Sequence, residues 1–569
     1  MRTSSLQGQS VKLESRTQSK DSILKESISM RKADRTTLAL FTCFFLAACA
    51  VYFTHLGAHP IFNPDEALYA EPAREMLETG EYVTTYLNYQ VRYTKPPLSI
   101  WAIAACMKTL GVTEFAARFF SACCGAILLG VTYLFTEKYA GRNSAILAAL
   151  ALLIAPLFLA ISRLALTDMP LSLFIAGSLM SLFHGFQVKE GRFKWIAYVL
   201  LGLGVMTKGP VALAVPAGVM FVYHLLMGEI KKAWAYYNPL SGLLVIALIA
   251  VPWFALEIYV TKGEYFEAFI MRENLERFTA VVDHKYPWWY HIAAMFGGFF
   301  PFSLFLPFAW YQAISRFRSR ASGSFDQCYV FLAVWSLCVL GFFSLSVSKL
   351  IPYTLPAFPA IAALSGIFAS GLISRASRLP IASFLALIAV LSSISFFTLE
   401  FVESKVRDCP PDLITLLPGT ILTLLAISLV SFLLALKKRL FASLVSFCCL
   451  MVLMVGFFGP KFLDVFANEW EEPVQAFCRY AALSDRPILV HSIRKPSATY
   501  YAERRVEMCP TEDLLVAHMT NSKEAYIIAR SKNAEFFKSI DGCKVMLSQG
   551  RFLLVSWINP NFRQEASDE

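Results

Sequence analysis

Charged residues are scarce in this chain. They make up 16% of its 569 residues, against about a quarter in soluble domains, while 56% are hydrophobic and the mean hydropathy is +0.53. Apolar runs of about 18 residues or more, long enough to cross a bilayer as a helix, recur down to about Pro460. This composition excludes an ordinary soluble protein and predicts a polytopic membrane protein with a tail.

Motifs for common cofactors are also missing. No C-x-x-C pair has a matching second half among the 13 cysteines, so the sequence predicts no zinc site. The tail has no glycine-rich phosphate loop, and we assign it no nucleotide. We therefore expect no certain cofactor, with a divalent metal left open. Cys478, Cys509 and Cys543 are enough for one disulfide in the tail, with one thiol left over.

The positive charge follows topology rather than nucleic-acid binding. The net charge is +10, but Lys and Arg are spread in short clusters between apolar runs. Residues 1–35 are rich in Ser, Lys and Arg and have no apolar core, which predicts a disordered cytoplasmic tail before an uncleaved first helix.

Thirteen apolar segments are predicted to span the membrane within a transmembrane domain of residues 36–460. They are Thr36–Leu56, Ala116–Thr136, Asn143–Ile161, Asp168–Gln187, Trp195–Thr207, Val211–Gly228, Pro239–Val260, His291–Ile314, Tyr329–Val347, Ile351–Leu372, Ile381–Phe401, Leu413–Leu436 and Leu440–Gly459. Leu98–Leu110 is short for a span, and counting it as one would move every later basic cluster to the outer side. We expect this segment to lie in or dip into the interface.

This topology gathers polar groups from distant parts of the chain on the outer side. They are the outer loop 57–115, Asp168, Lys208, the long loop Gly263–Tyr290 and the segment Ser348–Tyr353. Residues 461–569 fall on the same side and are predicted to form a small α/β domain. Its expected helices and strands are Pro473–Ala482, Pro487–Ser492, Ser497–Arg504, Ala525–Ala529, Lys544–Leu547 and Phe552–Trp557.

The outer loop begins with an unusually acidic stretch. In Asn63-Pro64-Asp65-Glu66, Asn63 is placed to cap a helix, so Asp65 and Glu66 need only complement the helix dipole. Capping does not explain the further acids Glu71, Glu75 and Glu78, or Pro72, which we expect to interrupt the helix. The residues alone leave a structural and a functional interpretation equally open.

The other outer polar residues also have simple structural explanations. Lys95 in Lys95-Pro96-Pro97 either snorkels from an interfacial helix or binds a phosphate. Asp168 is placed to cap the next span, and Lys208 is placed to snorkel at a helix end. In the long loop, Trp288-Trp289 suggests an interfacial belt, whereas Arg272, Arg277, His284 and Lys285 also suit an anionic headgroup.

In combination, these motifs resemble a known family. Asp65-Glu66-Ala-Leu-Tyr69, Arg74-Glu75-Met76 and Lys95-Pro96-Pro97-Leu98 resemble the first outer loop of integral-membrane glycosyltransferases that use polyprenyl-phosphate sugars. These are the aminoarabinose (lipid A) transferases and their protein O-mannosyltransferase relatives. The resemblance continues in order through Ala117-Arg118-Phe119, Arg163 to Asp168, Thr207-Lys208-Gly209-Pro210, Glu273 to Phe278 and Ser348-Lys349 to Pro356. It implies a C-type membrane glycosyltransferase fold of about 13 helices with an outer C-terminal α/β domain.

The resemblance implies an inverting transfer of one sugar from a lipid phosphate. Asp65 would be the catalytic carboxylate, Lys95 would stabilise the departing phosphate, and Asp168 would be the second acid. The substrate-binding residues implied are Glu66, Tyr69, Arg74, Tyr93, Arg163, Lys208, Arg272, His284, Lys349 and Tyr353. The expected partners are a polyprenyl-phosphate sugar donor, a lipid or protein acceptor of the cell envelope and membrane lipids, with no nucleic acid. The implied location is the bacterial inner membrane, with a cytoplasmic N-terminus and a periplasmic C-terminus.

Two positions depart from the aminoarabinose transferases, which typically carry Arg three residues after the first Asp and Glu just before the lysine of Lys-Pro-Pro. Here these positions are Leu68 and Thr94. They favour a neutral sugar or an acceptor other than lipid A. Further alternatives are a protein O-glycosyltransferase, a ligase for lipid-linked glycans, and a transporter or flippase, although no internal repeat supports transport.

Overall fold

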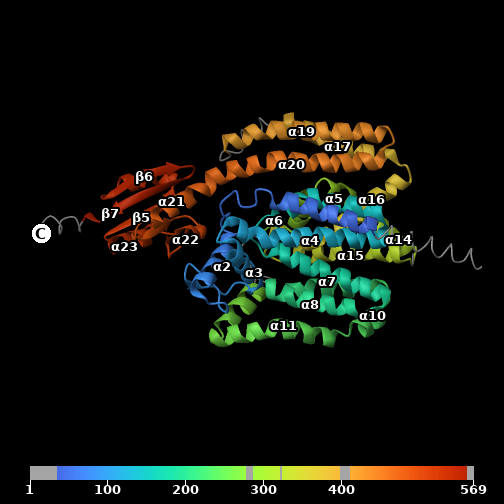
Figure 1. The fold of residues 1–569 in the computed structure, drawn as a ribbon, viewed down its shortest axis with the longest axis horizontal. Helices are drawn as coiled ribbons and strands as arrows, with labels where there is room; N and C mark the ends of the chain where they lie inside the picture. Colours follow the sequence, from blue (N-terminus) through green and yellow to red (C-terminus); the bar gives the residue numbers. More distant parts are fainter. Residues whose placement is uncertain (1–34, 277–285, 321–322, 398–409, 561–569) are drawn as a thin grey trace, which may run out of the picture.

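The computed structural model describes residues 35–276, 286–320, 323–397 and 410–560. Long helices lie side by side in a bundle, and a small sheet unit lies beyond one end of it (Figure 1). Nearly all of the predicted N-terminal tail, as well as Arg277, His284 and Lys285, falls outside the described residues.

The bundle contains the predicted spans. Nine helices of the described chain are long and apolar enough to cross a membrane: Arg35–Phe53, α4 (Glu114–Ala140), α7 (Asp168–Val188), α11 (Pro239–Val260), α15 (Ser324–Leu345), η3 with α16 (Ile351–Ser374), α17 (Arg378–Phe397), α19 (Pro411–Leu436) and α20 (Leu440–Trp470). Two bent pairs raise the number to 11: α5 (Arg142–Ile154) with α6 (Pro156–Ser162), and α13 (Tyr290–Gly298) with η2 (Phe302–Phe305) and α14 (Leu306–Arg318). Together with α8 (Gly191–Lys208) and α9 (Val211–Leu226), these helices occupy all thirteen predicted spans. The chain is a multi-pass membrane protein.

Helices α2 (Ala67–Thr79) and α3 (Leu98–Leu110) lie together at one end of the bundle (Figure 1). A 13-residue helix such as α3 is about 20 Å long, too short for a hydrocarbon layer of about 30 Å. The basic helix α10 (Ile230–Tyr237) and α14, which ends in Arg316 and Arg318, lie at the opposite end (Figure 1). The structure thus separates the basic clusters from the outer loop, as the charge pattern predicts.

The sheet unit follows α20 and lies at the same end as α2 and α3 (Figure 1). Its five strands run in the order β4-β3-β5-β7-β6, with β4, β3 and β5 parallel and the last two pairings antiparallel. Its elements are α21 (Glu472–Ala482), β3 (Ile488–His491), α22 (Ser497–Ala502), β4 (Glu507–Cys509), α23 (Glu512–Thr520), β5 (Glu524–Arg530), η4 (Ser531–Asn533), α24 (Ala534–Lys538), β6 (Cys543–Gln549) and β7 (Phe552–Ile558). All six predicted elements are present, and the three tail cysteines are free thiols.

Two expectations about the start of α2 were wrong. The helix begins at Ala67 and not after Asn63, whose side chain instead contacts the sheet unit. The helix also continues through Pro72. Proline has no N–H for the carbonyl of Leu68, four residues earlier, and the guanidinium of Arg92 donates to that carbonyl instead.

A buried ion pair joins the outer loop to the bundle. Arg118 of α4 donates to both carboxylate oxygens of Glu66, at 2.9 and 2.7 Å, and both side chains are at most 3% exposed. Glu66 also accepts from the backbone N–H groups of Phe62 and Ala165, at 2.9 and 2.7 Å. The buried charge of Glu66 is thus neutralised by Arg118, and both of its oxygens are hydrogen-bonded. The same bonds attach the outer loop to α4 and to the backbone before α7.

Removing one member of this pair should destabilise the protein strongly. We expect Glu66→Gln to lower the free energy of unfolding by about 3–5 kcal/mol, because it leaves Arg118 buried without its counter-charge. The matched control is Arg142→Gln, which breaks the more exposed Arg142–Glu137 pair and should cost less than about 1 kcal/mol. Unfolding by SDS titration in mixed micelles measures both. Equal stability of the two variants would contradict this role for Glu66.

Candidate functional site

Three helix ends bring a lysine, an acid and an aromatic ring together. Lys208, the last residue of α8, donates to Asp168, the first residue of α7, at 2.7 Å. The same ammonium lies over the ring of Tyr353 in η3 (Ile351–Ala357), 4.9 Å from its centroid. The two structural alternatives are therefore wrong: Asp168 makes no side-chain cap, and Lys208 does not extend alone toward the surface.

Further residues of the segment 346–353 pack around this group. The Tyr353 ring stacks on His291 of α13, with centroids 6.1 Å apart. Lys349 is 5% exposed and donates to the carbonyl of Ser346 at 2.5 Å. The Lys349 ammonium is thus directed inward and held by the backbone of its own turn.

Asp65 and Lys95 lie on the outer loop. The loop reaches the cluster through Glu66, whose carboxylate binds the N–H of Ala165, three residues before Asp168. Asp65 itself is exposed, whereas its neighbour Glu66 is buried. Lys95 is half-buried on the turn before α3. Consecutive acids therefore face opposite ways, one toward the bundle and one toward solvent.

Buried hydroxyls without hydrogen-bond partners flank both predicted catalytic segments. In the part of the chain that the structure describes, they include Thr94 Oγ1 beside Lys95, Ser99 Oγ in the first turn of α3 and Thr167 Oγ1 beside Asp168. Buried polar atoms are normally paired, and exceptions are commonly completed by a ligand or by water. Each of these three hydroxyls is available to a polar ligand or a water molecule.

Three further predicted binding residues make contacts within the protein. Tyr69 and Tyr93 hold the loop: the Arg92 guanidinium lies 5.4 Å from the Tyr69 ring centroid, and Tyr93 donates to Glu264 at 2.8 Å. Arg163 donates to the carbonyls of Val51 and Tyr52, at 2.8 and 3.0 Å.

Arg272 lies on the π-helix η1 (Phe266–Glu276), with its side chain 67% exposed and 3.9 Å from Glu267. The structure shows no contact between Arg272 and the Asp168 cluster among the described residues. His284 lies outside those residues. These two cationic predictions therefore remain predictions.

Arg74 belongs to a buried acidic cluster on α2. Its guanidinium makes two 2.8 Å bonds to Glu71 and one of 2.7 Å to Glu78. Glu75, which is 1% exposed, accepts from the backbone N–H of Tyr89. Burial, together with Glu71 alongside, raises the pKa of Glu75 to about 8. We therefore assign Arg74 to internal pairing, where it holds the α2 acids together.

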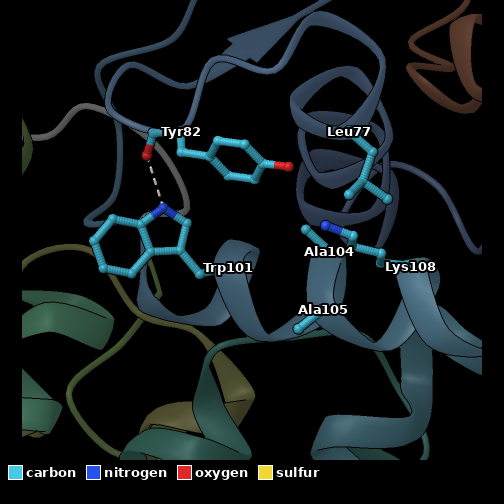
Figure 2. A pocket seen from close by; sticks show the side chains of 6 residues that line it. All are labelled: Leu77, Tyr82, Trp101, Ala104, Ala105 and Lys108. Atoms are coloured by element: carbon cyan, nitrogen blue, oxygen red, sulfur yellow. Dashed lines mark hydrogen bonds between the residues drawn. The ribbon is translucent and has the colours of Figure 1, made fainter.

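A separate pocket of about 460 Å³ lies between α2 and α3. Figure 2 shows its lining residues, Leu77, Tyr82, Trp101, Ala104, Ala105 and Lys108, with Trp101 donating to the carbonyl of Tyr82 at 2.8 Å. None of the predicted site residues lines this pocket. No group of three or more His, Cys, Asp or Glu side chains suited to a metal occurs in residues 35–276, 286–320, 323–397 and 410–560.

Comparisons with known proteins agree with this arrangement. Residues 35–262 match the family model of the dolichyl-phosphate-mannose-protein mannosyltransferases. The crystal structure of ArnT from Cupriavidus metallidurans bound to undecaprenyl phosphate superposes with a TM-score of 0.76, covering 91% of this chain and 98% of that one at 22% identity. The chain therefore has the fold of ArnT, and residues 35–262 are similar to the mannosyltransferase family. The fold predicted from the sequence is thereby confirmed.

Curated relatives match this chain over less than two thirds of their own length. An uncharacterised protein of Aquifex aeolicus is 32% identical over 331 residues, which span 58% of this chain and 63% of that protein. The undecaprenyl phosphate-alpha-4-amino-4-deoxy-L-arabinose arabinosyl transferase of Pectobacterium atrosepticum is 31% identical over 331 residues, or 57% of each chain.

Sequence reasoning assigned no role to three residues that hold the candidate site together. Arg92 replaces the bond that Pro72 removes, Arg118 neutralises Glu66, and His291 supports Tyr353. An arginine within a membrane-length helix was a usable signal for Arg118, because such charges normally have a buried partner. Nothing in the sequence indicates the partners of Arg92 or His291.

Glu75 should make stability depend on pH. Its pKa in the folded protein, about 8, exceeds the ordinary value of 4.5, so folding favours the protonated acid. The contribution of this group is full below about pH 4.5 and is lost as pH rises through about 8. We expect Glu75→Gln to reduce the loss of thermal stability between about pH 5 and about pH 8.5. An unchanged pH dependence in the variant would contradict the protonated state of Glu75.

Proposed function

We propose that this protein transfers a single sugar from a polyprenyl-phosphate carrier to a lipid A-type or other cell-envelope acceptor on the outer face of the bacterial inner membrane. The observation that carries the proposal is the placement of Asp65. This exposed carboxylate lies on a turn fixed by the buried Glu66–Arg118 pair, at the bundle end where the Asp168–Lys208 pair also lies. The similarity of residues 35–262 to the mannosyltransferase family supports the reaction type.

The residues support a displacement at the anomeric carbon. Asp65 accepts a proton from the acceptor's nucleophilic oxygen, or orients that oxygen, as it attacks from the face opposite the carrier. The bond between the anomeric carbon and the carrier phosphate breaks, and the electron pair leaves with the lipid phosphate. The configuration at the anomeric carbon is thereby inverted.

Cations of the outer loop and the helix ends suit the departing phosphate. Lys95 provides a point charge near the membrane surface, and Lys208 is held in place by Asp168 and Tyr353. The buried hydroxyls of Thr94 and Thr167, next to Lys95 and Asp168 in the sequence, provide further donors. Lys349 and Arg272 are the further cations that we assign to phosphate binding.

The proposal names a single sugar and does not extend to aminoarabinose. Leu68 and Thr94 stand where aminoarabinose transferases typically have an arginine and a glutamate, so two charges near the donor are missing. A protein acceptor is the second candidate, and the mannosyltransferase family match over residues 35–262 favours it. Radiolabelled product partitioning with lipid or with protein distinguishes the two acceptors.

Asp65→Asn should abolish transfer and leave binding intact. We expect turnover to fall by about 10²–10⁴-fold, because the amide cannot accept the proton. The measurement is sugar transfer in proteoliposomes from undecaprenyl-phosphate-linked donors to added lipid A, with binding of undecaprenyl phosphate measured in parallel. The matched control is Glu78→Gln, which alters an exposed acid on the same loop and should stay within about threefold of wild type. A fully active Asp65→Asn protein would overturn the assignment.

A further inference from the structure

The segment that leads from the first helix into α2 is held by two sets of contacts. In the first set, Arg118 donates to the carbonyls of Leu56, His59 and Pro60 at 2.7–2.9 Å. In the second set, His59, Ile61 and Asn63 contact α20, α22 or the turn between α20 and α21.

In the second set of contacts, the number of hydrogen bonds is highest at Asn63. His59 Nδ1 lies 3.7 Å from a carboxylate oxygen of Asp464, and the N–H of Ile61 donates to the Tyr501 hydroxyl at 2.7 Å. At Asn63 both ends of the carboxamide are engaged. Its Nδ2 donates to Glu471 and to the Ser497 hydroxyl, each at 2.6 Å, and its Oδ1 accepts from the N–H of Ser497 at 2.9 Å.

Glu471 itself is part of a buried pair. It is 3% exposed and accepts from Lys495 at 2.8 Å, while Lys495 also donates to the carbonyl of Trp470 at 2.6 Å. Burying these two charges has a desolvation cost that only a well-bonded network offsets. Such a network has one favoured arrangement, which makes it a rigid attachment. Asn63, two residues before Asp65, completes this one.

We propose that Asn63, Glu471, Lys495 and Ser497 form a clamp through which the C-terminal sheet unit sets the position of Asp65. The proposal rests on the proposed function of Asp65 and adds a role for the C-terminal unit. The four clamp residues are positioning residues, because they act on the acceptor only through the turn that carries Asp65. Displacing a reacting group by about 1 Å lowers rates by about 100-fold, so a loosened clamp affects turnover more than donor binding.

The clamp is tested by breaking it and then restoring it covalently. Asn63→Ala and Glu471→Gln should each lower kcat by about 10–100-fold, with KM for the undecaprenyl-phosphate-linked donor within about twofold of wild type. The double variant Asn63→Cys with Ser497→Cys should be slow when reduced. Oxidation should restore kcat to within about threefold of wild type, since a disulfide replaces the lost hydrogen bonds. Wild type treated with the same oxidant and reductant controls for the native thiols.

A matched control distinguishes a general loss of stability of the sheet unit from a loss of the position of Asp65. Glu524→Gln breaks the Arg486–Glu524 pair, at 2.7 Å, within the same sheet unit and away from residues 59–63. It should leave kcat unchanged. Clamp variants that raise KM as much as they lower kcat, or lower kcat no more than Glu524→Gln does, would overturn the proposal. A double variant that crosslinks by peptide mass spectrometry without regaining activity, or fails to crosslink, would overturn it too.

Hydrogen exchange separates failure of the clamp from failure of the proposed function. In nanodiscs, Asn63→Ala should raise amide exchange in residues 60–70, and the oxidised double variant should restore it. If wild type transfers no sugar to lipid A or protein, the proposed function fails. If transfer is normal and exchange in residues 60–70 is unchanged by Asn63→Ala, the clamp fails alone.

Discussion

The pairing of Glu66 with Arg118 is the interaction on which the outer end of this protein depends. An arginine within a membrane-length helix and an acid at the edge of the bundle are each costly to bury alone. Together they form two short bonds, and their remaining hydrogen-bonding capacity captures the backbone of residues 56–62 and of Ala165. The segments that carry Asp65 and Asp168 are thereby connected to one buried point.

This arrangement explains how adjacent acids have different roles. Glu66 is enclosed and holds the turn, while Asp65 is exposed at the same turn. Lys208 is held against Asp168 and Tyr353 by the ends of α8 and α7 and by η3. Because the loop is attached at both Glu66 and Asn63, the turn that carries Asp65 is held in place before the proposed reaction.

Much of the fold follows from the sequence, because it depends on local composition. Apolar length predicts each span, basic clusters predict sidedness, and short continuous apolar runs predict strands such as β5 and β7. The site is less predictable. Asn63-Pro64 has the local chemistry of a helix start, yet Asn63 bonds to Glu471, 408 positions later. The bond between Arg92 and the Leu68 carbonyl likewise follows only from the packing that brings the two together. Pairings of this kind depend on the folded shape, which composition does not encode.

The most direct test of the account is mass spectrometry of the surface glycolipids and glycoproteins of cells that lack this protein and are complemented with wild type or Asp65→Asn. The account predicts that one sugar is lost from a single acceptor class in the deletion, returns with wild type and stays absent with Asp65→Asn. Unchanged glycolipids and glycoproteins in the deletion, or full restoration by Asp65→Asn, would contradict it.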